Sequence, residues 1–119
     1  MILETLTKTG RRFVQDSRHK ASFTDRNGGL IASIGFVIMQ AGKELQSDFY
    51  QTNEGTIGHV KAVSYAKELA GTDASKCVLV VTYGKEYAAA TDDNNANTFT
   101  GSSPDVIRSL SKYFKPKNQ

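Results

Sequence analysis

The chain has 119 residues, of which 39% are hydrophobic and 23% charged, and it carries a net charge of +3 at neutral pH. This length fits one domain with a buried core, and the composition lies well outside the range of disordered chains. No apolar run approaches the ~20 residues that cross a bilayer, and the first residues lack the basic start and long apolar run of a secretory signal. We therefore expect a single domain, 1–119, that has no membrane span and stays in the compartment where it is made.

The charges are distributed unevenly along the chain. Residues 1–26 hold six basic and three acidic side chains, whereas residues 27–75 hold three basic and five acidic ones. Basic ends beside an acidic middle suit either binding to DNA or attraction between copies of the chain. The candidate residues for both roles are the basic side chains of the first segment: Lys8, Arg11, Arg12, Arg18 and Lys20.

The first segment has the periodicity of a helix. Apolar and small residues recur at three- and four-residue intervals from Ile2 to Ser17, which predicts an amphipathic helix over residues 2–18. Gly10 lies on the apolar stripe of this helix, where glycine costs about 1 kcal/mol relative to alanine. We expect it either to permit close packing or to mark a break.

Two strands are predicted after this helix. Residues 25–29 favour a turn, because asparagine and glycine tolerate positive φ. Residues 30–39 alternate between two faces that are both largely apolar, which predicts a central strand covered on each side. Residues 40–43 are the expected hairpin turn, and residues 44–50 are the expected second strand, with one face in water.

The middle of the chain predicts a second helix and the most buried strand. The apolar stripe expected for this helix consists of Ile57, Val60, Val63, Ala66, Leu69 and Ala70. Gly71 is its expected C-cap, and residues 72–75 are a predicted loop. Residues 76–83 are rich in β-branched side chains, which predicts an interior strand that ends before Gly84.

The last third of the chain predicts a short strand, a loop and a helix. Residues 86–91 are the expected strand, and the polar residues 92–101 are the expected exposed loop. Ser103, Pro104 and Asp105 then form a strong helix start, because serine caps, proline suits the first turn and aspartate complements the helix dipole. The expected buried stripe of this helix is Val106, Ile107, Leu110, Tyr113 and Phe114, with Pro116 beyond its end.

These elements predict an α+β fold. We expect a mostly antiparallel sheet of three to four strands, packed with an N-terminal helix, a middle helix and a C-terminal helix.

The sequence offers no recognisable catalytic arrangement. It contains neither the glycine-rich phosphate loops nor the nucleophile elbow of known enzyme classes. Cys77 lies in an apolar strand as a small buried hydrophobe, and His19 and His59 are isolated, without the ligand spacing of a metal site. We expect no enzymatic activity, no catalytic residue, no metal and no cofactor.

A series of short motifs follows the predicted elements in order. It consists of Asn27 and Gly28 in a turn, Leu30, Ser33, Ile34 and Gly35 in the next segment, and Gly84, Tyr87 and Ala88 around the later turn. This order and spacing, with a basic helix before it, resembles the neck or tail-completion proteins of long-tailed bacteriophages, a family of head-to-tail connectors and minor tail components. The chain departs from the family pattern at Asn27, where threonine is usual, at Ile31, where arginine is frequent, and at Asp92, where glutamate is more typical.

The resemblance implies a structural role. Such a protein would form a homomeric ring at the portal-to-tail junction or at the tail end, around the path of the DNA and in contact with neighbouring ring proteins. It would be part of the virion, assembled in the host cytoplasm, with no membrane partner. We expect the polar loop to reach the adjacent subunit or ring, and its candidate contact residues are Asp92, Asp93, Asn94, Asn95, Asn97 and Phe99.

Two other functions remain open from the sequence. The first is a small basic nucleic-acid-binding module that uses the five basic residues of the N-terminal helix; such binding would depend steeply on salt concentration. The second is a ribonuclease-like toxin of similar size and charge, for which RNA cleavage would be lost when one basic or acidic residue is changed.

Overall fold

The computed structural model describes residues 2–24, 28–70, 76–93 and 96–114. The expectations for the turn at 25–27 with Asn27, for Gly71 and the loop at 72–75, for Asn94 and Asn95, and for Pro116 lie outside these residues.

The α+β class is confirmed, with five antiparallel strands in place of the expected three to four. The helices are α1 (Ile2–Ala21), α2 (Gly29–Ser33), α3 (Asn53–Ala70) and α4 (Pro104–Ser111), followed by a 3₁₀ turn (Lys112–Phe114). The strands are β1 (Gly35–Gln40), β2 (Lys43–Asp48), β3 (Cys77–Tyr83), β4 (Glu86–Asp93) and β5 (Ala96–Gly101).

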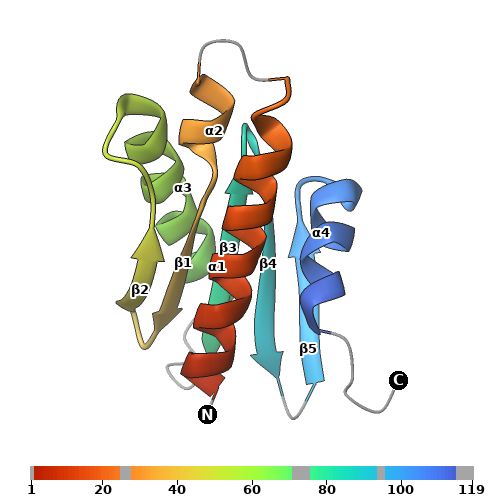
Figure 1. Ribbon diagram of the computed structural model, residues 1–119. Coiled ribbons are helices and arrows are strands. Elements are labelled where there is room, and N and C mark those ends of the chain that lie inside the picture. Colours follow the sequence, from red (N-terminus) through yellow and green to blue (C-terminus); the bar gives the residue numbers. More distant parts are fainter. Residues whose placement is uncertain (1, 25–27, 71–75, 94–95, 115–119) are drawn as a thin grey trace.

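The five strands form one sheet in the order β2-β1-β3-β4-β5. Figure 1 shows β2 and β5 at opposite edges and β3 in the middle. The turn between β1 and β2 is the one expected from the sequence: Ala41 and Gly42 both have positive φ, at 56° and 75°, as a two-residue hairpin turn requires. Helix α3 carries the chain from the edge strand β2 to the central strand β3.

Helices cover both faces of the sheet. On one face, Phe36 and Ile38 of β1 and Leu79 of β3 pack in one core cluster with residues of α1 and α4. On the other face, Val37 and Val80 pack with residues of α3. In Figure 1, α1 and α4 lie on the same side of the sheet, with α1 across its middle and α4 alongside β5. The expectation that both faces of the central strands are covered is therefore confirmed.

Helix α1 uses its glycine for close packing. A Cβ atom on Gly10 would lie 2.7 Å from a ring carbon of Phe36, so a larger residue would push the helix away from the sheet. Leu6, Phe13 and Val14 are buried on the same side. The helix continues without a break to Ala21, three residues beyond the expected end, because Ala21 is itself buried in this core.

The expected strand at 30–39 is only partly correct. Its first residues form the short helix α2, and extended structure begins at Gly35. Gly28 has a positive φ of 80°, and its carbonyl accepts a hydrogen bond from the amide of Ala32 at 3.0 Å, which turns the chain into a helical turn. The apolar pattern of residues 30–33 fits a helix as well as a strand, so the pattern alone does not decide between them.

The apolar stripe expected for α3 is also partly wrong. Ile57 and Val60 are 55% and 64% exposed, whereas the buried residues of this helix are small: Gly55, Gly58, Ala62 and Ala66. A Cβ atom on Gly58 would lie 3.2 Å from the carbonyl oxygen of Ser33. Small side chains let the helix approach closely, and this close approach decides which face of the helix is buried.

The expected exposed loop at 92–101 is wrong. Strand β4 continues to Asp93, and residues 96–101 form β5, which pairs with β4 from Asp93 opposite Ala96 to Ala88 opposite Gly101. The helix start after it is correct, since α4 begins at Pro104 with Ser103 as N-cap. The Ser103 side chain makes no capping hydrogen bond; its carbonyl accepts the amide of Ile107. Within the part of the chain described here, no helix is long and apolar enough to span a membrane.

Two valines test this distribution of burial. Val80 is fully buried and Val60 is 64% exposed. We expect Val80→Asp to unfold the protein, because an unpaired buried charge costs several kcal/mol out of a total stability of ~5–15 kcal/mol. The matched variant Val60→Asp should change stability by no more than about 0.5 kcal/mol. Urea denaturation followed by circular dichroism measures both, and a strongly destabilised Val60→Asp would show that α3 is rotated.

Candidate functional site

Three of the motif residues, Leu30, Ser33 and Gly84, meet at one junction of the fold. Ser33, the last residue of α2, donates its hydroxyl to the carbonyl of Leu30 at 2.6 Å and accepts the amide of Gly84 at 2.9 Å. The Thr82 hydroxyl donates to the carbonyl of Ser33 at 2.8 Å. Gly84 has a φ of 64° in the turn between β3 and β4. These bonds fasten α2 to the end of the central strand.

The remaining motif residues serve packing. A Cβ atom on Gly35 would lie 2.5 Å from the carbonyl oxygen of Asp48, so this position accepts glycine only. Ile34 and Ala88 are completely buried. The Tyr87 ring stacks on that of Tyr65 with centroids 3.7 Å apart. The motif residues that the structure describes therefore build the fold and do not bring reactive groups together.

A cavity of about 440 Å³ lies beside this junction. Leu30, Ile57, Tyr65 and Tyr87 give it apolar walls, and exposed charged side chains lie among its other lining residues. Thr82, which also lines it, already uses its hydroxyl within the junction.

The five basic residues of α1 divide into two groups. Arg18 is engaged inside the molecule: its guanidinium donates to the carbonyl of Ile34 at 2.9 Å, lies 3.5 Å from the Asp48 carboxylate and stands 4.2 Å from the centroid of the Tyr50 ring. It ties α1 to the start of β1 and the end of β2. The other four are exposed: Lys8, Arg11, Arg12 and Lys20. The structure thus leaves a smaller basic surface than the sequence predicts for nucleic acid.

The predicted contact residues of the polar segment lie in a β-hairpin. Asp92 and Asp93 end β4, and Asn97 and Phe99 belong to β5. Phe99 packs against the core, and its ring meets that of Phe114 edge to face, with centroids 5.1 Å apart. Residues 98–100 are β-branched or aromatic, which favours a strand. The polar residues on either side of them favour a loop, and a loop is the element predicted from the sequence.

The two edges of the sheet differ in chemistry. Edge strand β2 carries Lys43, Glu44 and Asp48, and its register with β1 shifts between Ile38 and Met39. Charges and bulges are common protections against edge pairing. Edge strand β5, Ala96–Gly101, contains no charged residue and no proline, so it lacks these protections.

The backbone of β5 has hydrogen-bonding groups that point away from its one partner strand among the described residues. The amide of Ser102 donates to the Tyr87 carbonyl on β4 at 3.0 Å. Bonded and non-bonded residues alternate along an antiparallel pair, so Asn97, Phe99 and Gly101 direct their amides and carbonyls away from β4. In the described residues, β4 is the only strand that pairs with β5.

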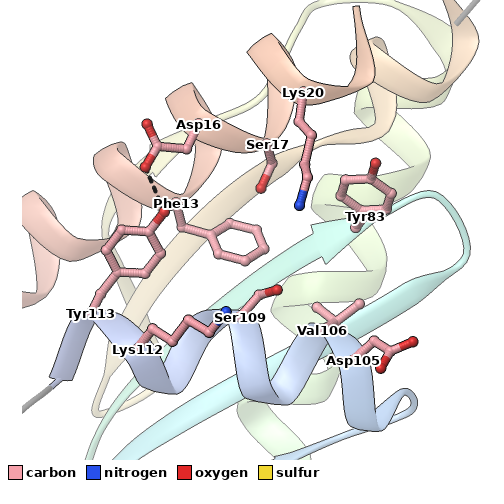
Figure 2. A pocket seen from close by; sticks show the side chains of 10 residues that line it. All are labelled: Phe13, Asp16, Ser17, Lys20, Tyr83, Asp105, Val106, Ser109, Lys112 and Tyr113. Carbon is pink, nitrogen blue, oxygen red and sulfur yellow. Dashed lines mark hydrogen bonds between the residues drawn. The ribbon is translucent and has the colours of Figure 1, made fainter. Parts of the chain in front are cut away.

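A second cavity, of about 280 Å³, lies between α1 and α4 (Figure 2). At one side of it the Tyr113 hydroxyl donates a hydrogen bond to the Asp16 carboxylate at 2.6 Å. Burial raises the pKa of Tyr113 to about 12, and the bond to Asp16 adds to this effect. The phenol is therefore neutral at physiological pH and keeps the Asp16 carboxylate engaged.

Ionisable groups elsewhere show no metal-binding arrangement. Among the residues that the structure describes, no group of three or more His, Cys, Asp or Glu side chains could hold a metal ion. His59 and Glu44 lie 2.6 Å apart on the surface. Burial acts to raise the pKa of Glu44, but hydrogen bonds from His59 and Ser47 outweigh it, and the pKa lies below its ordinary value. Cys77 is buried, as the sequence predicts.

Comparison with family models, with curated proteins and with solved structures finds no significant match. The resemblance to phage neck and tail proteins therefore rests on the order of the motif residues alone.

The role of Arg18 in the fold can be measured. We expect Arg18→Met to lower the free energy of unfolding by about 1–3 kcal/mol, because the bond to the Ile34 carbonyl and the contact with Tyr50 are lost. The exposed Arg11→Met is the matched control and should stay within about 0.5 kcal/mol of the wild type. Equal effects in chemical denaturation would contradict the internal role of Arg18.

Proposed function

We propose that the chain is a non-enzymatic structural subunit that associates with copies of itself through the outer edge of β5. The observation that supports this function is the chemistry of that edge, with six residues that carry no charge and no proline. Unpaired backbone groups on such a strand are a template for a further strand. The contrast with the charged and bulged β2 singles out one edge.

The strand directions favour a two-fold pair. A two-fold axis perpendicular to the sheet brings β5 against β5 of a second copy in antiparallel orientation, which continues the antiparallel sheet of each copy. A closed ring requires contact between unlike surfaces, and on the sheet edges this would place β5 beside β2 of the next copy. Strands β2 and β5 run in the same direction within one chain, since the four pairs that link them are all antiparallel. In a ring, β5 would therefore pair with β2 of the next copy in parallel orientation. The charges of β2 oppose this pairing.

The biological setting comes from the resemblance alone. Neck and tail-completion proteins of tailed phages are structural subunits, so a virion assembled in the host cytoplasm is the proposed place of action. In that setting the β5 pair is the first step of assembly, and contacts with portal or tail proteins complete it. The homomeric ring around the DNA path remains a proposal that the edge variants below test.

The edge contact is tested with two lysine variants. Thr98 is exposed on β5, and Gln46 is exposed on β2. We expect the wild-type protein to form dimers as concentration rises, and Thr98→Lys to remain monomeric with a nearly unchanged melting temperature, because a charged edge resists pairing. Gln46→Lys is the matched control and should dimerise like the wild type in light scattering after gel filtration.

Other results of the light-scattering experiment would contradict the β5 contact or change the proposed geometry. A wild type that stays monomeric at millimolar concentration, or a Thr98→Lys variant that still dimerises, contradicts the β5 contact. Loss of association in both variants supports a ring in which β5 meets β2.

A further inference from the structure

The cavity between α1 and α4 gathers polar groups from three elements over an apolar floor. Phe13 of α1 and Val106 of α4 are buried beneath it, and Tyr83 at the end of β3 closes one side. Figure 2 shows Lys20 reaching down from α1 toward Tyr83, and Lys112 running along the C-terminal helical segment to end near Ser109. Both ammonium groups thus border the same space.

Both lysines of the cavity, Lys20 and Lys112, lack an ion-pair partner among the described residues. The two carboxylates that line the cavity have partners of their own: Asp16 accepts the hydrogen bond of Tyr113 at the side of the cavity, and Asp105 pairs with Arg108 at 3.0 Å. The cavity is therefore lined by two lysines without an ion pair in the described part of the chain and by two carboxylates that already have partners.

Two serine hydroxyls complete the polar lining. Ser17 of α1 and Ser109 of α4 face each other across the cavity in Figure 2. Lysine presents a compact charge with several donors, whereas the flat fork of arginine matches a planar carboxylate. Lysines and hydroxyls arriving from two sides suit a tetrahedral anion, which has acceptor oxygens in several directions.

We propose that this cavity binds a small organic phosphate monoester, with the phosphate between Lys20 and Lys112 and the apolar part of the ligand on Phe13, Val106 and the Tyr83 ring. The site is separate from the outer edge of β5, so it does not depend on the self-association proposed above. Such a ligand would join α1 to α4 and stabilise the folded state in proportion to its occupancy.

The probe for this test is phenyl phosphate, titrated into the full chain and followed by amide NMR shifts and by melting temperature. We expect saturable shifts at residues 17, 20, 109 and 112 and a rise in melting temperature with ligand concentration. The double variant Lys20→Gln/Lys112→Gln should bind at least about tenfold more weakly, because charge-assisted hydrogen bonds to the phosphate are lost. Lys8→Gln/Lys43→Gln, with the same change in net charge at exposed positions, should bind like the wild type.

Related compounds separate the parts of the proposal. Phenol and benzoate should bind more weakly than phenyl phosphate, and so should inorganic phosphate. Equal binding of phenol would overturn the anion site, tighter binding of benzoate would overturn the phosphate assignment, and equal binding of inorganic phosphate would overturn the role of the apolar floor. Absence of saturable binding at millimolar phenyl phosphate, or unchanged binding in the Lys20/Lys112 variant, would overturn the proposal as a whole. All four side chains changed are exposed, and circular dichroism confirms that each variant folds.

Discussion

The double burial of β3 is the constraint on which the rest of the structure depends. Val78 and Val80 face one side of the sheet and Leu79 and Val81 face the other, and all four are essentially inaccessible to water. A strand that is apolar on both faces must have a packing layer on each side. Helix α3 supplies one layer, and α1 with α4 supplies the other. Strands β1 and β4 pair with the two sides of β3, so β2 and β5 are the edge strands of the sheet in the described part of the chain.

This arrangement leaves two kinds of surface for function. The first is the pair of sheet edges, where main-chain groups are available and side-chain chemistry decides which edge can accept another strand. The second is the seam between α1 and α4, where two helices diverge over a small apolar floor and polar side chains from both reach one cavity. The motif residues Ser33 and Gly84 belong to neither surface; together with Thr82 they fix the end of β3 against α2. Residues that serve packing can follow the same order in two proteins that have different partners.

Much of the fold follows from periodicity, and the errors have physical causes. The helical stripe from Leu6 to Val14, the run of β-branched residues in β3 and the turn at Ala41 and Gly42 are local signals, and each predicts the observed element. Residues 30–33 were misassigned because an apolar run fits a helix or a strand equally well until Ser33 and Gly84 meet across 51 positions of sequence. The exposure of Ile57 and Val60 follows from the close approach of α3 through Gly58, Ala62 and Ala66, which periodicity of large apolar residues does not reveal.

The candidate sites were less predictable than the fold. The basic character of α1 is visible in the sequence, but the internal position of Arg18 depends on Ile34 and Tyr50, which come near it only in the folded chain. Lys20 and Lys112 lie 92 positions apart and no motif joins them. The polar composition of residues 92–101 predicts an exposed loop that contacts a neighbour. The proposed contact lies in the same segment but uses the backbone of a strand.

Hydrogen exchange at the Phe99 amide tests the central claim most directly. This amide points away from β4, whereas its side chain packs in the core, so its protection reports on the outer edge of the sheet. If β5 pairs with a second copy, the Phe99 amide exchanges rapidly in dilute protein and becomes protected as concentration rises, while the amide of Gln46 on β2 does not change. Exchange at Phe99 that is independent of concentration, under conditions where the protein is shown to self-associate, would contradict assembly through β5.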